Sequence, residues 1–275
     1  MKLLMTALFT VILLASTAGA ENSRIVSLAP SITHCLYELG LDSAIVGITA
    51  YCPKGITKKT IIGTLWEPNI EEIVALKPDL IIASKEGNKK NSIATMKKLG
   101  LTVIVVEAAR NFDEICSNTT HLGTILSRTK QAAAVVATAQ RRIEAVRMRR
   151  QASHSRVTVF WEVGARPLFT IGTRSFMNDY NQYLNTVNLF GDISIGYPQV
   201  SREEVLRRNP DVMFIIAMSG VSVQEKQQWH SYTTITAVRN NRVFYIDNQD
   251  YLVPTPLNFA AAAEHFDQLL NTTTP

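Results

Sequence analysis

The chain has 275 residues, of which 46% are hydrophobic and 19% charged, with 10 prolines and 13 glycines. These proportions are those of ordinary globular proteins, and they exclude a disordered, collagen-like or coiled-coil chain. The net charge is +5, and much of the excess lies between residues 128 and 150. We interpret this basic stretch as the solvated face of a long helix rather than as a surface for an anionic partner, and we expect no nucleic-acid partner.

The first 20 residues differ from the rest of the chain. Lys2 is followed by an apolar stretch over residues 3–14 and by small residues at 18–20, the pattern of a cleavable secretory signal peptide. The apolar stretch is shorter than the about 20 residues that a membrane-spanning helix needs. Glu21, and not a cysteine, follows the cleavage site. We therefore expect an exported, soluble protein without a lipid anchor.

Short apolar segments alternate with segments of helical periodicity along the chain. Strands are expected at residues 24–28, 45–48, 80–83, 103–106, 157–161, 212–216 and 243–246. Helices are expected at residues 31–40, 69–76, 91–99, 113–127, 129–150, 175–189, 201–208, 223–230 and 256–270. Short, wholly apolar strands that alternate with helices indicate mainly parallel sheets covered on both faces.

One expected helix is much longer than the others. Residues 129–150 contain neither Gly nor Pro, and Val136, Ala139, Ile143 and Val146 recur at steps of three and four residues. This spacing places them on one face of a helix. At 1.5 Å per residue the helix would be about 30 Å long, enough to join two lobes.

The chain also contains an internal repeat on either side of that helix. Residues 69–82 align without gaps with residues 201–214, each as a capped helix, a Pro-Asp turn and an apolar strand. We therefore predict an α/β fold of two Rossmann-like lobes with mainly parallel sheets, joined by the long helix, with a ligand cleft between the lobes. The predicted division is residues 21–127 for the N-terminal lobe, 128–152 for the connecting helix and 153–275 for the C-terminal lobe.

The chain has 3 cysteines, Cys35, Cys52 and Cys116, whose spacing matches no zinc or haem motif. Export would place them where disulfides persist. Cys35 and Cys52 each lie near the end of an early strand, where loops converge, so they are the expected disulfide pair. The alternative is that all of them are small buried residues.

Four segments resemble a known family. They are RIVSLAPSIT (residues 24–33), VGIT (46–49), NIEEIVALKPDLIIA (69–83) and YPQVSREEVL (197–206). In this order they resemble the class III, or helical-backbone, periplasmic binding proteins of ABC importers, and among these the cobalamin binders. The resemblance covers essentially the whole chain after the first 20 residues.

The resemblance implies a receptor of the periplasm and not an enzyme. Such a receptor is a monomer without a cofactor or resident metal ion, and it holds its ligand between two lobes. It delivers that ligand to a membrane permease with a cytoplasmic ATPase. By position in the motifs, Glu71 and Glu203 would dock onto arginines of the permease, one from each lobe. The alternative is that both acids simply favour the positive end of a helix.

The resemblance also points to aromatic ligand contacts, because a large flat ligand is held mainly by apolar surface. The residues expected in this role are Tyr51, Trp66, Tyr197, Trp161 and Tyr251. Each of them could instead belong to a core. Trp66 lies in a loop before a helix, which favours a functional role, whereas Trp161 is as readily a core residue.

The chain departs from the cobalamin binders at two places. Ser84-Lys85-Glu86 stands where those proteins have a tryptophan, and residues 247–256 lack the arginine expected near the polar side of the ligand. A corrinoid is therefore the main prediction, and haem or a ferric siderophore is the alternative within the family.

An exported α/β enzyme is the rival from another class. The sequence has no G-x-S-x-G, G-x-G-x-x-G, P-loop or H-E-x-x-H motif. Its 5 histidines are scattered singly, and only His34 follows a motif at the rim of the first lobe. No sequence pattern indicates a metal site, which would need three or four converging ligand residues.

Overall fold

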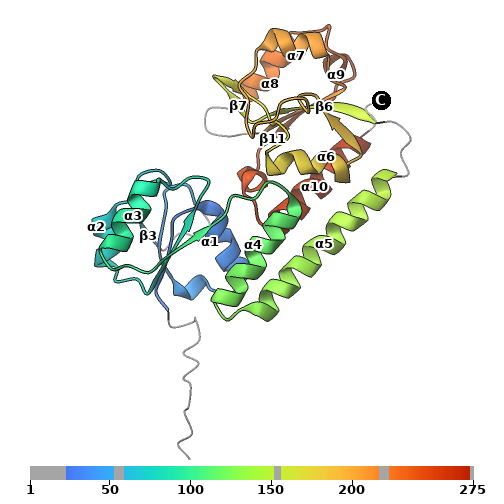
Figure 1. Cartoon of the computed structure of the whole chain (residues 1–275). Helices are drawn as coiled ribbons and strands as arrows, with labels where there is room; N and C mark the ends of the chain where they lie inside the picture. Colours follow the sequence, from blue (N-terminus) through green and yellow to red (C-terminus); the bar gives the residue numbers. More distant parts are fainter. Residues whose placement is uncertain (1–22, 53–58, 152–155, 217–222, 273–275) are drawn as a thin grey trace, which may run out of the picture.

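The computed structural model describes residues 23–52, 59–151, 156–216 and 223–272. Two α/β lobes are joined by a long helix, as the alternation of strands and helices predicted (Figure 1). The expected signal peptide, residues 1–20, lies outside the described residues. Among the described helices, none is both long and apolar enough to span a membrane.

The N-terminal lobe contains a five-stranded sheet in the order β3-β2-β1-β4-β5, with every pair parallel. This is the order of a doubly wound fold. The strands are β1 (Ile25–Ser27), β2 (Ile45–Ile48), β3 (Thr60–Ile61), β4 (Leu80–Ser84) and β5 (Val103–Val106). The helices are α1 (Pro30–Glu38), η2 (Asp42–Ala44), α2 (Ile70–Ala75), α3 (Lys90–Lys98) and α4 (Phe112–Ile125).

The C-terminal lobe contains a four-stranded parallel sheet in the order β11-β10-β6-β9. Its strands are β6 (Val157–Glu162), β9 (Thr186–Asn188), β10 (Val212–Ile216) and β11 (Val243–Ile246), and β7 (Gly164–Ala165) forms an antiparallel hairpin with β8 (Leu168–Phe169). The helices are η3 (Phe176–Asp179), α6 (Tyr180–Tyr183), α7 (Arg202–Arg208), α8 (Val223–His230), α9 (Thr236–Arg239), η4 (Gln249–Leu252) and α10 (Pro256–Asn271).

The internal repeat corresponds to equivalent elements of the two lobes. The order β2-β1-β4-β5 in one sheet matches β9-β6-β10-β11 in the other, and α2 and α7 lead into β4 and β10. Asp79 accepts a hydrogen bond from the backbone N–H of Arg24 at 2.7 Å, and Asp211 accepts one from Thr158 at 2.8 Å. Each Pro-Asp turn therefore binds the first strand of its own lobe, which explains why the turn recurs.

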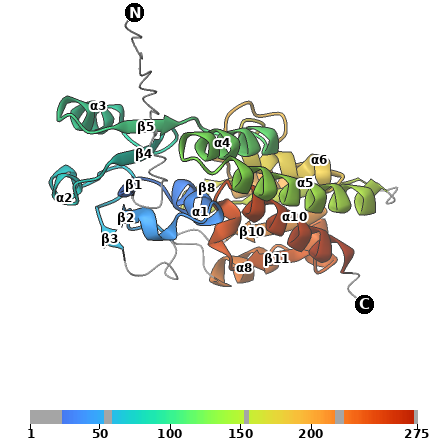
Figure 2. The same ribbon diagram turned by 90° about the horizontal axis from the view of Figure 1, so that it is seen from below.

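The connecting helix α5 (Thr129–Gln151) belongs to both hydrophobic cores. Ala132 is buried with residues of the N-terminal lobe, whereas Ala139, Ile143 and Val146 are buried with residues of the C-terminal lobe. Helices α4, α5 and α10 pack together along one side of the molecule (Figure 2). Because α5 is packed into the cores of both lobes, it favours one fixed orientation of the lobes relative to each other.

The basic residues of α5 are only partly a solvated face, which corrects the interpretation of that stretch. Arg142 pairs with Glu264 of α10 at 2.6 Å, and Arg149 pairs with Asp267 at 2.9 Å. Arg150 is buried and donates to the backbone oxygen of Leu184 at 3.0 Å. Much of the positive charge thus binds α5 to the C-terminal lobe.

The helix predicted over residues 175–189 is wrong. The segment contains two short helical turns, η3 and α6, and then the strand β9. Asn185 adopts φ of 52°, which ends the helical turn. Thr186–Asn188 then pairs with β6 over three residues. Such a short strand is set by its neighbour in the sheet and leaves little periodicity in the sequence.

The prediction that Trp161 contacts the ligand is also wrong. Its side chain is 0% exposed and lies in the core of the C-terminal lobe. The ring centroid lies 4.9 Å from that of Phe214 and 5.0 Å from that of Phe266, and the indole N–H donates to Asn181 at 3.2 Å. A buried tryptophan needs such a partner for its N–H.

The expected disulfide between Cys35 and Cys52 is absent, since both are free thiols in the structure. Cys35 is buried and its Sγ lies 3.8 Å from Thr119 of α4. The Cys52 Sγ lies instead 3.1 Å from Thr33 Oγ1. Thr33 and Cys35 are two residues apart on α1, about 200° around the helix axis, so the two thiols lie toward different sides of it.

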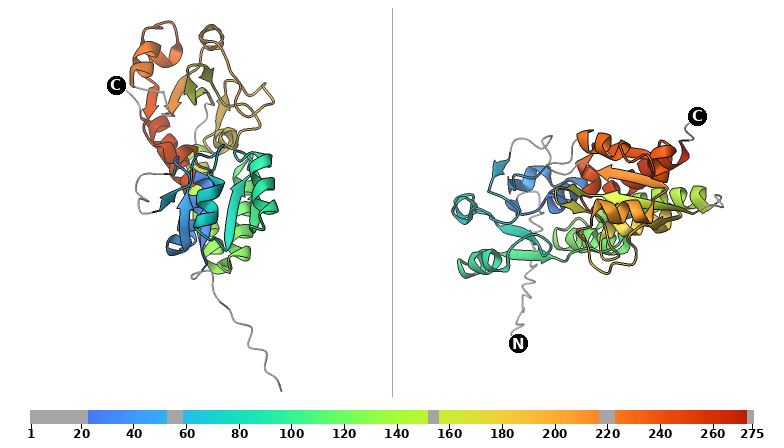
Figure 3. Two further views of the ribbon diagram at one scale, coloured as in Figure 1. Left: turned by 90° about the vertical axis from the view of Figure 1, so that its left-hand side faces the viewer. Right: turned by 90° about the horizontal axis from the view of Figure 1, so that it is seen from above.

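The left view of Figure 3 shows the C-terminal lobe, in yellow to red, above the N-terminal lobe, in blue to green. Polar contacts join the two lobes directly, in addition to the connecting helix. Thr255, the N-cap of α10, donates to Glu38 Oε1 of α1 at 2.6 Å. His34 Nε2 lies 3.5 Å from Asp250 Oδ1. The backbone N–H of Phe112 donates to Asp179 at 2.8 Å. These contacts set how the loops of the two lobes face each other.

Replacing Trp161 with Ala should lower the free energy of unfolding by about 3–5 kcal/mol, because it opens a cavity in an aromatic core. Urea unfolding followed by circular dichroism measures this loss. Trp66→Ala is the matched control, since Trp66 is 52% exposed and should change stability by less than about 0.5 kcal/mol. Equal losses in both variants would contradict the core assignment of Trp161.

Replacing Glu38 with Gln should change how stability depends on pH. Burial raises the pKa of Glu38 from 4.5 to about 7, despite the hydrogen bonds from Thr255 and Leu257. The folded state therefore holds this proton more tightly than the unfolded state. The resulting stabilisation is complete below pH 4.5 and is lost as the pH rises through about 7.

The loss for the unsubstituted protein should approach about 3 kcal/mol, since each pKa unit is worth about 1.4 kcal/mol. Urea unfolding of both proteins at several pH values between these limits provides the comparison. The difference between the two stability curves should grow in favour of Glu38→Gln as the pH rises. Parallel curves would mean that Glu38 does not titrate in this way.

Candidate functional site

The loops at the carboxyl ends of the parallel strands bring together the exposed aromatic side chains predicted from the sequence. In open parallel sheets, ligands bind at this edge. Tyr51 follows β2, Trp66 follows β3 and Glu86 follows β4, all in the N-terminal lobe. Tyr197 and Asp250 follow β9 and β11 in the C-terminal lobe. We call these five residues the interlobe face.

Tyr51 and Trp66 form an exposed aromatic pair. They are 53% and 52% exposed, and their ring centroids lie 5.5 Å apart at an interplanar angle of 69°. Edge-to-face contact of this kind is favourable for two rings, yet it leaves a large apolar area in water. A contiguous exposed apolar area on a soluble protein commonly marks a binding surface.

The loop that carries Trp66 is held in place by a tight turn at Gly63 and by hydrogen bonds from Asn88. Gly63 adopts φ of 95°, and a Cβ there would lie 2.5 Å from the backbone oxygen of Glu67, so only glycine fits. The buried Asn88 side chain donates to the backbone oxygens of Leu28 and Leu65, at 3.1 and 2.6 Å. Asn88 thus ties together the loops after β1, β3 and β4.

Tyr197 lies on the opposite lobe. The residue is 41% exposed, and its hydroxyl is hydrogen-bonded to Ser175. Burial, and after it the negative charge of Glu86, raises the pKa of Tyr197 to about 12. Because Glu86 belongs to the other lobe, this electrostatic interaction acts between the two lobes.

Tyr251 has a packing role in the structure. Its hydroxyl lies 3.1 Å from His265 Nδ1, and its ring contacts Phe266 edge-on with centroids 5.8 Å apart. These contacts hold η4, and with it Asp250 beside His34. The burial of His34 lowers its pKa, an effect that Asp250 partly opposes.

Glu71 and Glu203 occupy equivalent exposed positions in the first turns of α2 and α7. A helix that follows a parallel strand begins at the carboxyl end of that strand, so both acids lie at the edge of their sheet that carries the interlobe face. Hydrogen bonds from its own backbone N–H and from Ser201 keep the pKa of Glu203 below its usual value. Its neighbour Glu204 instead pairs with Arg207 at 2.6 Å.

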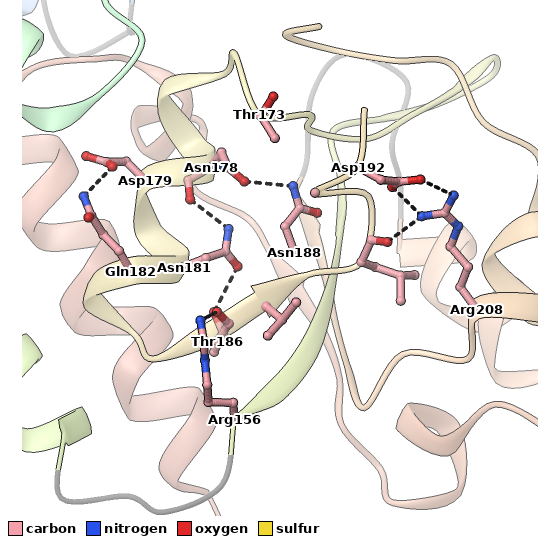
Figure 4. Close-up of a pocket in the computed structure, with 13 residues that line it drawn as sticks. Arg156, Thr173, Asn178, Asp179, Asn181, Gln182, Thr186, Asn188, Asp192 and Arg208 are labelled. Carbon is pink, nitrogen blue, oxygen red and sulfur yellow. Dashed lines mark hydrogen bonds and ion pairs between the residues drawn. The ribbon is translucent and has the colours of Figure 1, made fainter. Parts of the chain in front are cut away.

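A separate pocket of about 580 Å³ lies entirely within the C-terminal lobe, beside β9 (Figure 4). Polar side chains that line this pocket form hydrogen bonds and ion pairs with one another. Asn188 donates to Asn178 Oδ1 at 3.0 Å, and Arg208 pairs with Asp192 at 2.6 Å. Since every lining residue belongs to one lobe, this pocket is distinct from the interlobe face.

No cluster of three or more metal-ligating side chains occurs within the described parts of the chain. The interlobe face therefore offers aromatic rings and carboxylates for binding. Sequence reasoning noted Glu86 only as a departure from a motif, and it missed Asn88. The available signal was a polar residue just after a wholly apolar strand, where loops of a parallel sheet converge.

The fold agrees with a comparison to known protein families. Residues 25–250 match the family model described as periplasmic binding protein. This chain belongs to the periplasmic binding protein family.

Individual relatives agree with this assignment. The chain is 30% identical over 256 residues to the vitamin B12-binding protein of Vibrio cholerae serotype O1, covering 92% of this chain and 90% of the relative. The crystal structure of the periplasmic vitamin B12 binding protein BtuF of Vibrio cholerae is similar, with a TM-score of 0.73, 28% identity and coverage of 91% of this chain and 97% of that one.

A second solved structure is also similar. It is described as a possible iron-binding, periplasmic solute-binding protein from Staphylococcus epidermidis. It has a TM-score of 0.77 and 29% identity, and the match covers 92% of this chain and 100% of that one.

Proposed function

We propose that this protein captures a corrinoid between its two lobes and delivers it to the permease of an ABC importer. The observation that carries the proposal is the exposed Tyr51–Trp66 pair on one lobe, with Tyr197 exposed on the other. Such rings can bind the apolar faces of a large flat ligand, while a few polar groups set its orientation. The vitamin B12-binding relatives support the choice of a corrinoid.

The proposal includes a location and a partner. The protein is exported by a cleaved signal peptide over residues 1–20 and acts as a monomer in the periplasm, without a lipid anchor. It has no catalytic role. Glu71 and Glu203 bind cationic residues of the permease, one from each lobe, and a cytoplasmic ATPase powers uptake. Exposed carboxylates at such a surface steer association and fix the register of the complex.

Titration of the purified protein with defined compounds tests the ligand class. The compounds are cyanocobalamin, dicyanocobinamide, haemin and ferrichrome, and binding is followed by tryptophan fluorescence and by calorimetry. Saturable binding of the two corrinoids is expected. If only haemin or ferrichrome binds, the protein is still a receptor, but the corrinoid assignment is wrong. If none of them binds, the proposed function is not supported.

Replacing Trp66 with Ala should weaken corrinoid binding by about 1–3 kcal/mol, roughly 5- to 150-fold in Kd, because an aromatic contact is lost. Calorimetry measures the affinity, and urea unfolding checks that stability is unchanged. Met148→Ala is the control, since Met148 is a 65% exposed apolar side chain on α5. Normal affinity in Trp66→Ala would exclude Trp66 from the binding surface.

Reversing the charge of both Glu71 and Glu203 to Lys should reduce uptake of labelled cyanocobalamin by roughly tenfold or more, while ligand affinity stays unchanged. Uptake is measured in cells that carry only the variant protein. The control adds positive charge elsewhere, with Gln140→Lys and Glu144→Lys on α5. Undiminished uptake in the first variant would contradict the docking role.

A further inference from the structure

Glu86 is a charged residue of the interlobe face for which the proposed function gives no role. It stands directly after β4, in the segment Ser84-Lys85-Glu86 where the sequence departs from the cobalamin binders. The residue is exposed in part, yet enough protein surrounds its carboxyl to raise its pKa by desolvation. A carboxylate here would meet any ligand held between the aromatic rings of the two lobes.

The turn that carries Glu86 is held in place by hydrogen bonds. The backbone N–H of Glu86 donates to Ser84 Oγ at 3.2 Å, and the backbone N–H of Ser84 donates to Asn88 Oδ1 at 2.6 Å. Asn88 in turn binds Leu65, in the loop of Trp66. The carboxylate therefore has a fixed place beside the aromatic pair, and a preorganised group discriminates between ligands better than a mobile one.

The lysines near Glu86 in the chain do not neutralise it. Lys85 binds Glu107 at 2.8 Å, and Lys89 binds Glu67 at 2.9 Å. Burial raises the pKa of Glu86, and none of the described cations lowers it again. Its charge also acts on the hydroxyl of Tyr197 in the other lobe, which is neutral at physiological pH.

On the opposite lobe, the exposed Arg174 lies in the loop that hydrogen-bonds to Ile195, close in sequence to Tyr197, and a carboxylate lies in another loop. This second carboxylate is Asp250, in the loop after β11, whose side chain is 44% exposed. The nearby His34 is mostly uncharged at neutral pH, because burial lowers its pKa. The described interlobe face therefore combines apolar rings with hydrogen-bond acceptors and negative charge.

We propose that Glu86 determines ligand specificity, by accepting hydrogen bonds from a neutral or cationic ligand rich in N–H groups and by repelling ligands that carry carboxylates. This inference rests on the proposed function. The carboxamide side chains at the edge of a corrinoid supply such N–H donors, whereas haem carries two propionate carboxylates. Specificity of this kind is a difference between affinities, and repulsion of the wrong ligand contributes as much as attraction of the right one.

The test compares Glu86→Gln with the unsubstituted protein, using probes that differ in charge. Aquocyanocobinamide is a cation, dicyanocobinamide is neutral and haemin is anionic. The variant should bind aquocyanocobinamide roughly tenfold more weakly, bind dicyanocobinamide almost unchanged, and bind haemin roughly tenfold more tightly. Glu107→Gln is the control, because that carboxylate is already paired with Lys85.

A pH series separates this role from a structural one. Affinity of the unsubstituted protein for aquocyanocobinamide should rise as the pH passes upward through the raised pKa of Glu86, because the carboxyl loses its proton, and the rise should disappear in Glu86→Gln. If both proteins bind the corrinoids but Glu86→Gln changes all affinities equally or not at all, the specificity role is wrong and the proposed function stands. If the unsubstituted protein binds haemin and no corrinoid, or binds no probe, both proposals are overturned.

Discussion

The shared helix α5 is the constraint on which the rest of the structure depends. It is buried in the core of the N-terminal lobe at Ala132 and in that of the C-terminal lobe at Val146. Ion pairs from Arg142 and Arg149 to α10 hold its second half. Gly123 of α4 allows a close approach, since a Cβ there would lie 2.4 Å from the Ala132 Cβ. A helix fixed at both ends leaves the lobes little freedom to hinge, so the loops that face each other are set by packing.

Because the orientation of the lobes is fixed, exposed side chains of the two lobes are held at one common surface. Tyr51 and Trp66 expose about half of their area to water, and neither is needed for the core of its own lobe. The electrostatic effect of Glu86 on Tyr197 places the opposite lobe within reach. Apolar rings, a tyrosine hydroxyl and a carboxylate thus lie at the same edge of the two sheets. Such an arrangement suits a ligand with flat apolar faces and a polar rim.

The two lobes contribute unequally to this arrangement. The N-terminal lobe supplies the aromatic pair and Glu86, and the buried amide of Asn88 holds the loops that carry Trp66 and Glu86. In the C-terminal lobe, the aromatic residues Trp161 and Tyr251 pack internally, so Tyr197 is the exposed ring among those predicted there. Glu71 and Glu203 nevertheless retain equivalent positions, because both sit in the repeated helix that precedes a central strand. The repeat therefore includes both glutamates, while the loops that carry the aromatic residues differ between the two lobes.

The sequence by itself determined the alternation of strands and helices, the long helix and the two similar lobes, because these features depend on local periodicity and capping. Strands β2, β5, β10 and β11 have the predicted limits for this reason. Three other features depended on contacts between distant residues. The strand Thr186–Asn188 forms because it pairs with β6, and Trp161 is enclosed by aromatic residues from three other elements. The thiols of Cys35 and Cys52 lie toward different sides of α1. The electrostatic interaction of Glu86 with Tyr197 was likewise decided by tertiary structure, since a single sequence carries no signal of which loops from two lobes will meet.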